Sequence, residues 1–252
     1  MTRLQKRPEV DPHAYDAWLF DLDGVITDTA RVHASAWKKM FDEYLERRAK
    51  RDNVPFEPFK IKPDYVQYVD GKPRYDGVDS FLRSRGIELD WGDPEDPPQK
   101  ETVCGLGNRK NEMFNEVLKE DGAVVFQSSV DLVKKIKAEG KRVAVVTSSK
   151  NCHTVLEVAG LEDLFDARVD GNVAAEHNLK GKPDPHTYEV AAVFLGSPGD
   201  RCVVIEDAIS GVQAGKAGGF GLVIGIARHD KPAALLRNGA DIVVNDLSEL
   251  EY

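Results

Sequence analysis

The sequence predicts a doubly wound α/β fold, in which helices cover both faces of a parallel β-sheet. One observation is that short apolar runs recur along the chain, at residues 17–20, 142–147, 202–205, 221–226 and 240–244. A second is that segments with helical periodicity lie between these runs and end at glycines, namely Gly140, Gly160 and Gly196. Nearly all-apolar strands that alternate with helices are typical of a parallel sheet buried on both faces.

The three helices of this core are predicted from apolar residues that recur at intervals of three or four. These residues are Val130, Val133 and Ile136 in the first helix, Val155, Val158 and Ala159 in the second, and Tyr188, Ala191, Ala192 and Leu195 in the third.

The segment from His33 to Asp121 interrupts the alternation and indicates an inserted helical domain. A helical pattern covers residues 36–45, and residues 76–86 and 108–122 suggest two further helices. Residues 90–107 are rich in proline, glycine and aspartate, so we expect a loop there. The expected domains are a core of residues 1–32 and 122–252, and a helical cap of residues 33–121 inserted after the first strand.

Composition limits the class of protein. The net charge of −9 argues against attraction to nucleic acid or an anionic membrane, and the basic run 47–51 is interpreted as a solvated helix end. No stretch approaches the ~18 apolar residues of a membrane helix, and the N-terminus has no signal-like apolar region. Three cysteines without metal-type spacing fit a reducing compartment. We therefore expect a cytoplasmic protein, in which the negative charge does not forbid an anionic small-molecule substrate, and nothing indicates a protein partner.

Polar residues follow the predicted strands at the points where the strands end. Asp21 and Asp23 follow the first strand, Thr147 to Lys150 end the second run, and Glu206 and Asp207 follow the third. Lys182 lies in a proline-containing loop between the last two. Ligands of open α/β sheets bind beyond the carboxyl ends of the strands, so these residues are expected to form one site.

Four carboxylates gathered at one edge would repel one another unless a cation lies among them. Oxygen ligands suit Mg²⁺, which can share its coordination shell with a substrate phosphate. The Thr147 hydroxyl and Lys182 could bind phosphoryl oxygens, Asp21 could act as nucleophile, and Asp23 could act as general acid and base. Each acidic pair alone is more often a cap or turn, but four elements in this order favour phosphoryl-transfer chemistry.

The stretches DLDGVITDT, VVTSS, KGKPDP and VIEDA resemble, in order, the four motifs of the haloacid dehalogenase superfamily. The resemblance implies a Rossmann-like core with Asp21 as nucleophile and Asp23 as acid/base. It implies Thr147 as the phosphate-binding hydroxyl and Lys182 as the charge clamp. It also implies that Mg²⁺ is held by Asp21, the main-chain carbonyl of Asp23, Glu206 and Asp207.

Within that superfamily the sequence is similar to the β-phosphoglucomutase-like subfamily, through DLDGVITDTA with the following His33, Ala36, Trp37 and Lys38, and through SSKN. That resemblance implies a helical cap whose Gly-x-x-Arg-x-Asp pattern corresponds here to Gly71, Arg74 and Asp76. It further implies a cap lysine at Lys110, a His33 that orients Asp23, and a substrate-binding loop of Ser148, Ser149, Lys150 and Asn151. The chain departs from the family in a longer cap, with RRAKRDNVPFEPFKIKPDY, and in Asp70, beside which Lys72 could compensate.

Three functions are compatible with these residues. The first is a β-phosphoglucomutase, which converts β-glucose 1-phosphate to glucose 6-phosphate through an aspartyl phosphate and a 1,6-bisphosphate. The second is a sugar-phosphate phosphatase, in which water is the acceptor. The third, a non-catalytic sensor, is disfavoured because Asp21, Asp23 and Lys182 are all present. The cap residues Arg74 and His33 favour the mutase, because a mutase must hold two phosphates at once.

Overall fold

The computed structural model describes residues 7–69, 72, 74–228 and 232–252. The chain divides into two compact units. The core unit comprises Met1–Thr29 and Ala123–Tyr252, and the inserted unit comprises Ala30–Gly122. The role of the inserted unit as a cap stays a prediction.

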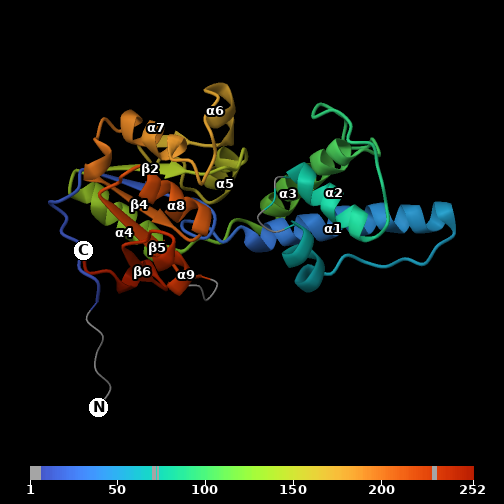
Figure 1. The fold of residues 1–252 in the computed structure, drawn as a ribbon, viewed down its shortest axis with the longest axis horizontal. Coiled ribbons are helices and arrows are strands. Elements are labelled where there is room, and N and C mark those ends of the chain that lie inside the picture. The colour runs from blue at the N-terminus through green and yellow to red at the C-terminus, as the bar shows by residue number, and fades with distance from the viewer. Residues whose placement is uncertain (1–6, 70–71, 73, 229–231) are drawn as a thin grey trace, which may run out of the picture. The chain divides into compact units, whose positions relative to one another are not determined.

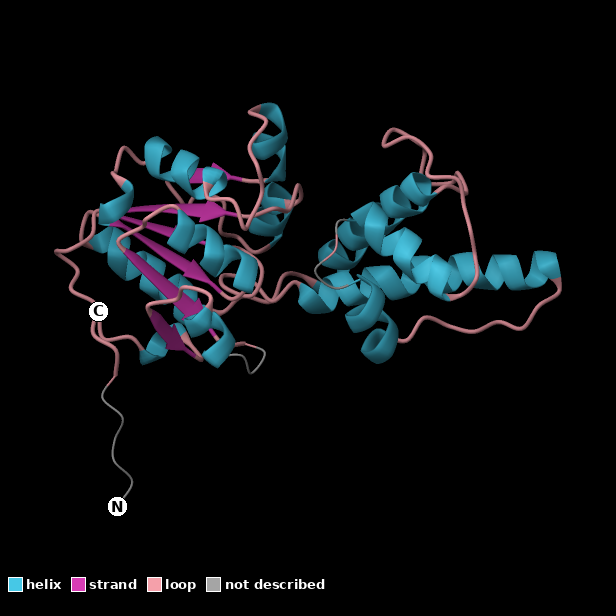
Figure 2. Ribbon diagram, in the orientation of Figure 1, coloured by secondary structure: helices cyan, strands magenta, loops and turns pink. Residues whose placement is uncertain are grey.

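The core unit contains a parallel sheet of six strands in the order β3-β2-β1-β4-β5-β6 (Figures 1 and 2). The strands are β1 Ala17–Phe20, β2 Arg142–Val146, β3 Ala167–Val169, β4 Cys202–Glu206, β5 Leu222–Ile226 and β6 Ile242–Val244. The predicted doubly wound parallel sheet is confirmed. β3 was not predicted from sequence, because its three residues, Ala-Arg-Val, form no apolar run.

Among the described residues of the core unit, six α-helices flank the sheet (Figure 2). They are α4 Gln127–Ala138, α5 Cys152–Val158, α6 Gly171–Glu176, α7 His186–Phe194, α8 Ile209–Ala217 and α9 Pro232–Arg237. Ala17 and Leu19 of β1 pack in one apolar cluster with Tyr188 of α7 and Val212 of α8. Because side chains alternate along a strand, Trp18 and Phe20 point to the opposite face, and all four β1 side chains are buried. Burial on both faces explains why β1 is apolar throughout.

The register of the central strands decides which residues emerge together at the carboxyl edge. Phe20 at the end of β1 pairs with Val145 of β2 and with Ile205 of β4. The amide of Asp21 donates to the carbonyl of Ile205 over 3.0 Å. Asp21 therefore leaves the sheet at the same level as Glu206.

The inserted unit is helical. It contains α1 Ala30–Asp52, a π-helical turn η1 Ile61–Val69, α2 Arg74–Ser84 and α3 Val103–Asp121. The basic run 47–51 forms the last turns of α1, with Lys50 and Arg51 exposed, as expected of a solvated helix end.

The expected loop over residues 90–107 is wrong in its last part, because α3 already begins at Val103. The hydroxyl of Thr102 accepts a hydrogen bond from the amide of Gly105 over 3.0 Å and donates to Asp96 over 2.7 Å. This N-cap satisfies a backbone donor that the first helical turn leaves unpaired. The glycines of Cys-Gly-Leu-Gly, read as loop signals, are needed for close packing. A Cβ on Gly105 would lie 2.2 Å from the carbonyl oxygen of Lys100.

The extended segment that precedes η1 inserts one aromatic side chain, Phe59, into the core of the inserted unit. Phe59 is buried between Phe41 of α1 and Phe81 of α2, with ring centroids 5.1 and 4.9 Å away. Its backbone is fixed to α1, because its amide donates to Asp42 over 2.7 Å and its carbonyl accepts from Lys38 over 3.0 Å. The added sequence therefore contributes to the core of this unit.

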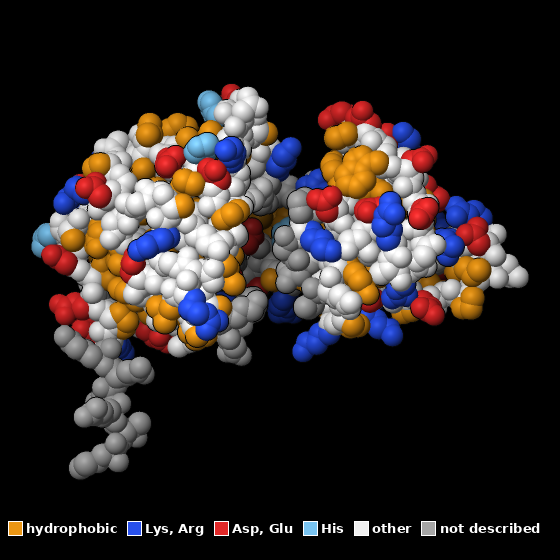
Figure 3. All heavy atoms as spheres, in the orientation of Figure 1, with side chains coloured by type: hydrophobic (Ala, Val, Ile, Leu, Met, Phe, Trp, Pro, Cys, Tyr) orange, Lys and Arg blue, Asp and Glu red, His pale blue; other side chains and the backbone are white. Residues whose placement is uncertain are grey.

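The surface carries charges of both signs, and the described helices can be compared with the length and apolar character of a membrane span. On the visible face of each unit, positive and negative side chains are interspersed (Figure 3). Among the described residues, no helix combines the length and the apolar character needed to span a bilayer.

We predict that Phe59→Ala destabilises the inserted unit by about 3–5 kcal/mol, the usual cost of truncating a fully buried phenylalanine. The matched control is Phe56→Ala in the same segment, where the side chain is 45% exposed and the expected change is within about 0.5 kcal/mol. Urea unfolding followed by circular dichroism measures both. Equal effects of the two substitutions would contradict the contribution of Phe59 to the core of the inserted unit.

Candidate active site

Lys182 connects the ends of three strands. Its ammonium donates to Asp21 Oδ1 over 2.5 Å, to Glu206 Oε1 over 2.5 Å and to the carbonyl of Val146 over 3.1 Å. Lys182 comes from the loop before α7, whereas the three acceptors follow or end β1, β4 and β2. The expectation that these residues meet at the carboxyl edge agrees with this geometry.

The acidic residues of this edge could hold a metal ion. One carboxylate oxygen each from Asp21, Glu206 and Asp207 lies within 4.8 Å of the others. Two glycines make room for them. A Cβ on Gly211 would lie 1.8 Å from Glu206 Oε1, and one on Gly24, whose φ is +88°, would lie 2.1 Å from Asp207 Oδ2. This set of hard oxygen donors fits a divalent cation of the Mg²⁺ class.

The charges of the cluster are not balanced by the protein alone. Burial, and after it the charge of Glu206, raises the pKa of Asp207 to about 7. Burial also raises the pKa of Asp21 well above its ordinary value, although the Lys182 ammonium opposes the rise. Burial by itself would lower the pKa of Lys182, but the carboxylates of Asp21 and Glu206 hold it well above the usual range. One ammonium among several carboxylates leaves negative charge that a cation can neutralise.

Asp23 lies on the loop that follows β1, and its side chain is held by a residue that the sequence analysis did not select. The buried hydroxyl of Thr29 donates to Asp23 Oδ1. The loop itself is closed by the hydrogen bond from the amide of Gly24 to the carbonyl of Thr27, at 2.7 Å. Thr29 fixes the orientation of the Asp23 carboxylate.

The loop after β2 carries the remaining predicted core residues. Thr147 is buried, and its hydroxyl accepts from the amide of Ser149 over 3.1 Å. The hydroxyl of Ser149 in turn accepts from the amide of Asn151 over 3.1 Å. Ser148 and Lys150 are exposed. Thr147 directly follows Val146, which accepts from Lys182, so the loop starts beside the acidic cluster.

The predicted residues of the inserted unit form a cluster of their own. Lys110 Nζ lies 2.7 Å from His33 Nδ1 and stands over the rings of Trp37 and Phe114, at 5.1 and 5.0 Å from their centroids. Burial, and after it the charge of Lys110, lowers the pKa of His33 well below its ordinary value. The neutral ring therefore accepts from Lys110 at Nδ1 and carries its proton on Nε2.

Arg74 belongs to the same unit and donates to Asn111 over 2.9 Å. Of the other residues in the predicted arginine pattern, Asp76 is exposed, and Gly71 lies outside the described residues, as does Asp70. Lys72 is exposed and donates to Ser80 over 2.5 Å.

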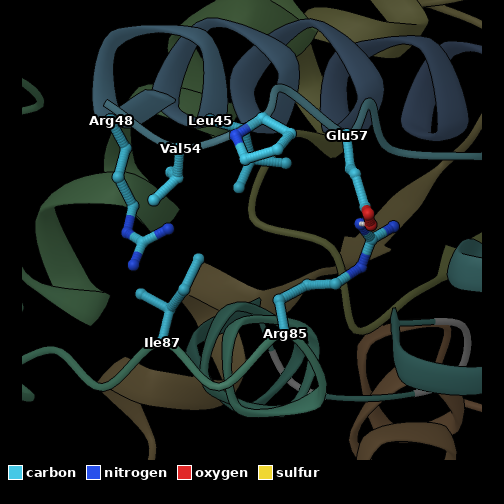
Figure 4. Close-up of a pocket in the computed structure, with 7 residues that line it drawn as sticks. Leu45, Arg48, Val54, Glu57, Arg85 and Ile87 are labelled. Atoms are coloured by element: carbon cyan, nitrogen blue, oxygen red, sulfur yellow. Dashed lines mark hydrogen bonds and ion pairs between the residues drawn. The ribbon is translucent and has the colours of Figure 1, made fainter. Parts of the chain in front are cut away.

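The inserted unit also contains a cavity of about 210 Å³ that none of the predicted site residues lines (Figure 4). Its lining consists of Leu45, Arg48, Val54, Pro55, Glu57, Arg85 and Ile87. Arg85 is already paired with Glu57 at 3.0 Å and with Asp64 at 2.9 Å. This pairing leaves Arg85 little excess positive charge with which to bind an anion.

Sequence reasoning overlooked two side chains of the core site. Thr29 stands in the quoted first motif, and its hydroxyl was the available signal. Tyr188 was counted only as an apolar position of α7, yet its hydroxyl donates to Glu206 Oε1 over 2.8 Å. No local pattern distinguishes a tyrosine that fills a core from one that holds a carboxylate.

In the absence of divalent cations, we predict that the free energy of unfolding falls as pH rises from about 5 to about 8. The pKa of Asp207, about 7 in the folded state against an ordinary 3.8, means that the fold retains a proton that the unfolded chain releases. The stabilisation from this retained proton is complete below the pKa of Asp207 in the unfolded chain and is lost as pH rises through about 7. It amounts to at most ~4 kcal/mol. Bound Mg²⁺ should remove most of the fall.

Urea unfolding at several pH values, with EDTA or with excess Mg²⁺, measures this dependence. Asp207→Asn should flatten the pH profile in EDTA. An unchanged profile in that variant would contradict the assignment.

Comparisons with known proteins agree with this fold and these motifs. The family model of haloacid dehalogenase-like hydrolases matches residues 15–219. A Mycobacterium tuberculosis (strain CDC 1551 / Oshkosh) protein named beta-phosphoglucomutase is 51% identical over 242 residues, which cover 95% of this chain and 92% of that protein. A protein of the same name from Bacillus subtilis (strain 168) is 32% identical over 236 residues, which cover 93% of this chain and 91% of that protein.

Among solved structures, a HAD family hydrolase from Deinococcus radiodurans R1, with bound phosphate and sodium, is similar to this chain. Its TM-score is 0.67 at 28% identity, and the match covers 94% of this chain and 93% of that chain. These matches extend over both units. The chain belongs to the haloacid dehalogenase superfamily of enzymes and, within it, to the β-phosphoglucomutase-like subfamily.

Proposed function

We propose that this protein is a β-phosphoglucomutase that interconverts β-D-glucose 1-phosphate and glucose 6-phosphate. The proposed route passes through an aspartyl phosphate on Asp21 and a glucose 1,6-bisphosphate. The observation that carries the proposal is that the Lys182 ammonium donates to Asp21 and to Glu206, each over 2.5 Å, beside Asp207. The 51% identity to a protein named beta-phosphoglucomutase supports the choice of substrate.

In this proposal Asp21 is the nucleophile and Asp23 moves the proton. A carboxylate oxygen of Asp21 attacks the phosphorus, the bond from phosphorus to the departing sugar oxygen breaks, and Asp23 donates a proton to that oxygen. In the second half, Asp23 accepts the proton of the other sugar hydroxyl as that hydroxyl attacks the aspartyl phosphate. Lys182 and the Thr147 hydroxyl bind the phosphoryl oxygens, where negative charge accumulates.

Mg²⁺ is the cation that we propose for the acidic cluster. Asp21, Glu206, Asp207 and the main-chain carbonyl of Asp23 would hold it, and their oxygen donors fit a hard divalent ion. When bound, Mg²⁺ neutralises charge on the phosphoryl group.

The inserted unit and the loop after β2 would supply contacts to the second phosphate and the sugar. We propose that Arg74 binds the phosphate that is not transferred, with Lys110 and His33 as further donors. His33 carries a proton on Nε2, so it can donate to an oxygen while its Nδ1 accepts from Lys110. Ser148, Ser149, Lys150 and Asn151 would contact the distal phosphate and the sugar.

A sugar-phosphate phosphatase is the second candidate, because the matching family model is one of hydrolases. The same Asp21 and Asp23 would serve, with water in place of the sugar hydroxyl as acceptor. The two functions differ in whether inorganic phosphate or the isomeric sugar phosphate leaves the site.

We predict that the protein, supplied with β-glucose 1-phosphate, Mg²⁺ and a trace of the 1,6-bisphosphate, forms glucose 6-phosphate with little inorganic phosphate. Coupled assays follow the two products separately. Asp21→Asn should lower the rate about 10³-fold or more, because it removes the nucleophile. Phosphate release without isomer would support the phosphatase, and isomerisation that survives Asp21→Asn would exclude the aspartyl phosphate.

Arg74→Ala is predicted to impair isomerisation, which needs both phosphates, at least about 10-fold more than hydrolysis of a small monophosphate. The charge-assisted hydrogen bonds of one arginine account for this magnitude. Arg83→Ala on the same helix is the control, since Arg83 is exposed and pairs with Asp79 over 2.8 Å. Equal losses of both activities in Arg74→Ala would count against its proposed role.

A further inference from the structure

Tyr188 reaches the acidic cluster from within the hydrophobic core. Its side chain is fully buried in the layer formed by α7 and α8. Its hydroxyl donates to Glu206 Oε1 over 2.8 Å, and the Lys182 ammonium stands over its ring, 4.9 Å from the centroid. The hydroxyl of Tyr188 therefore contacts the Glu206 carboxylate, while its ring contacts the Lys182 ammonium.

The hydrogen bonds of Lys182 use all the donors that an ammonium has. A lysine ammonium carries three protons, and they are taken by Asp21 Oδ1, Glu206 Oε1 and the carbonyl of Val146. A phosphoryl oxygen can gain a bond from Lys182 only if one of these is released. Under the proposed function the phosphoryl group is transferred to Asp21, so we expect the hydrogen bond from Lys182 to Asp21 to be replaced by one to a phosphoryl oxygen. Lys182 then remains held by Val146 and Glu206.

The Glu206 carboxylate is thus the anchor of Lys182 during transfer, and its own position depends on few groups. Its Oε2 accepts from the amide of Ala208 over 3.2 Å, and its Oε1 from Tyr188 and Lys182. Beneath it is Gly211, where a Cβ would lie 1.8 Å from Oε1, so no side chain supports the carboxylate from that direction. Tyr188 is the neutral donor that fixes Oε1 independently of Lys182.

We propose that Tyr188 is a positioning residue. Its hydroxyl fixes the Glu206 carboxylate and its ring face supports the Lys182 ammonium, so that Lys182 stays in place when its bond to Asp21 is exchanged for one to a phosphoryl oxygen. This inference rests on the proposed phosphoryl transfer at Asp21. It does not depend on which sugar carries the phosphate.

Two substitutions separate the hydroxyl from the ring. Tyr188→Phe keeps the ring and its packing but removes the donor, and Tyr188→Leu removes both. Tyr15→Phe is the matched control, because its hydroxyl bonds to Gly221 over 3.5 Å before β5, at the opposite edge of the sheet. For each variant we would measure the melting temperature, kcat and KM with β-glucose 1-phosphate, and the ¹H–¹⁵N signal of the Lys182 ammonium, assigned by its loss in Lys182→Met.

In Tyr188→Phe, kcat is expected to fall about 10- to 100-fold with little change in KM, as for loss of a hydrogen bond to a charged group. The Lys182 signal should exchange faster with water but keep its ring-current shift. Tyr188→Leu should lose that shift and more activity, and Tyr15→Phe should match the wild type. A merely structural role would lower the melting temperature and leave kcat of the folded protein unchanged.

A wild-type kcat together with an unchanged Lys182 signal in Tyr188→Phe would overturn the role of Tyr188 and leave the proposed function standing. If the wild-type protein transfers no phosphoryl group, the proposed function fails instead. The exchange rate of the Lys182 signal in Tyr188→Phe then still reports whether Tyr188 fixes the ammonium. An unchanged rate would overturn the positioning role of Tyr188 as well.

Discussion

The ammonium of Lys182 is the contact on which the polar edge of the sheet depends. Asp21 and Glu206 are almost fully buried, and a buried carboxylate is costly unless it is paired and hydrogen-bonded. Lys182 bonds to both at 2.5 Å and to the carbonyl of Val146 at 3.1 Å. A single ammonium therefore joins the ends of β1, β2 and β4 and partly offsets the repulsion between the acids. Burial, and after it the charge of Glu206, raises the pKa of Asp207, and a divalent cation would neutralise the negative charge that the carboxylates carry.

This arrangement follows from the parallel sheet. Because β1 lies between β2 and β4 in register, residues that follow these strands emerge side by side. The strands themselves are apolar and buried on both faces, so polar groups can appear only where they end. The residues proposed for chemistry thus follow the strands at their carboxyl ends, whereas the residues that stabilise the sheet lie within the strands. The exceptions are Tyr188 and Gly211, which belong to core helices and yet determine where Glu206 lies.

Much of this organisation was predictable from the sequence, for physical reasons that also explain what was missed. Apolar runs that end in acids gave β1, β4 and their site residues, and helical spacing gave α4, α5 and α7. β3 was missed because a three-residue strand has no pattern, and the start of α3 because glycines that permit close packing resemble loop signals. Thr29, six residues from Asp23, was overlooked although its hydroxyl lies in the first motif. The role of Tyr188 depends instead on tertiary contacts that it makes from a buried helix face with residues of other elements. Such contacts leave no local signature.

Charge distribution reconciles an acidic protein with the phosphorylated substrate that we propose for it. The net charge is −9, the face shown in Figure 3 carries charges of both signs, and at physiological salt the effect of surface charge is screened beyond about 8 Å. Buried cations are screened much less. In the core unit Lys182 is such a cation. In the inserted unit Lys110 is buried and lies over the rings of Trp37 and Phe114, and Arg74 is half-buried. The inserted unit thus contains sheltered positive charge, whereas the core cluster would attract a phosphoryl group only with the divalent cation proposed for it. The proposed bisphosphate would need both. A phosphatase for monophosphates needs only the core cluster, so the positive charge of the inserted unit is the feature that favours the proposed mutase.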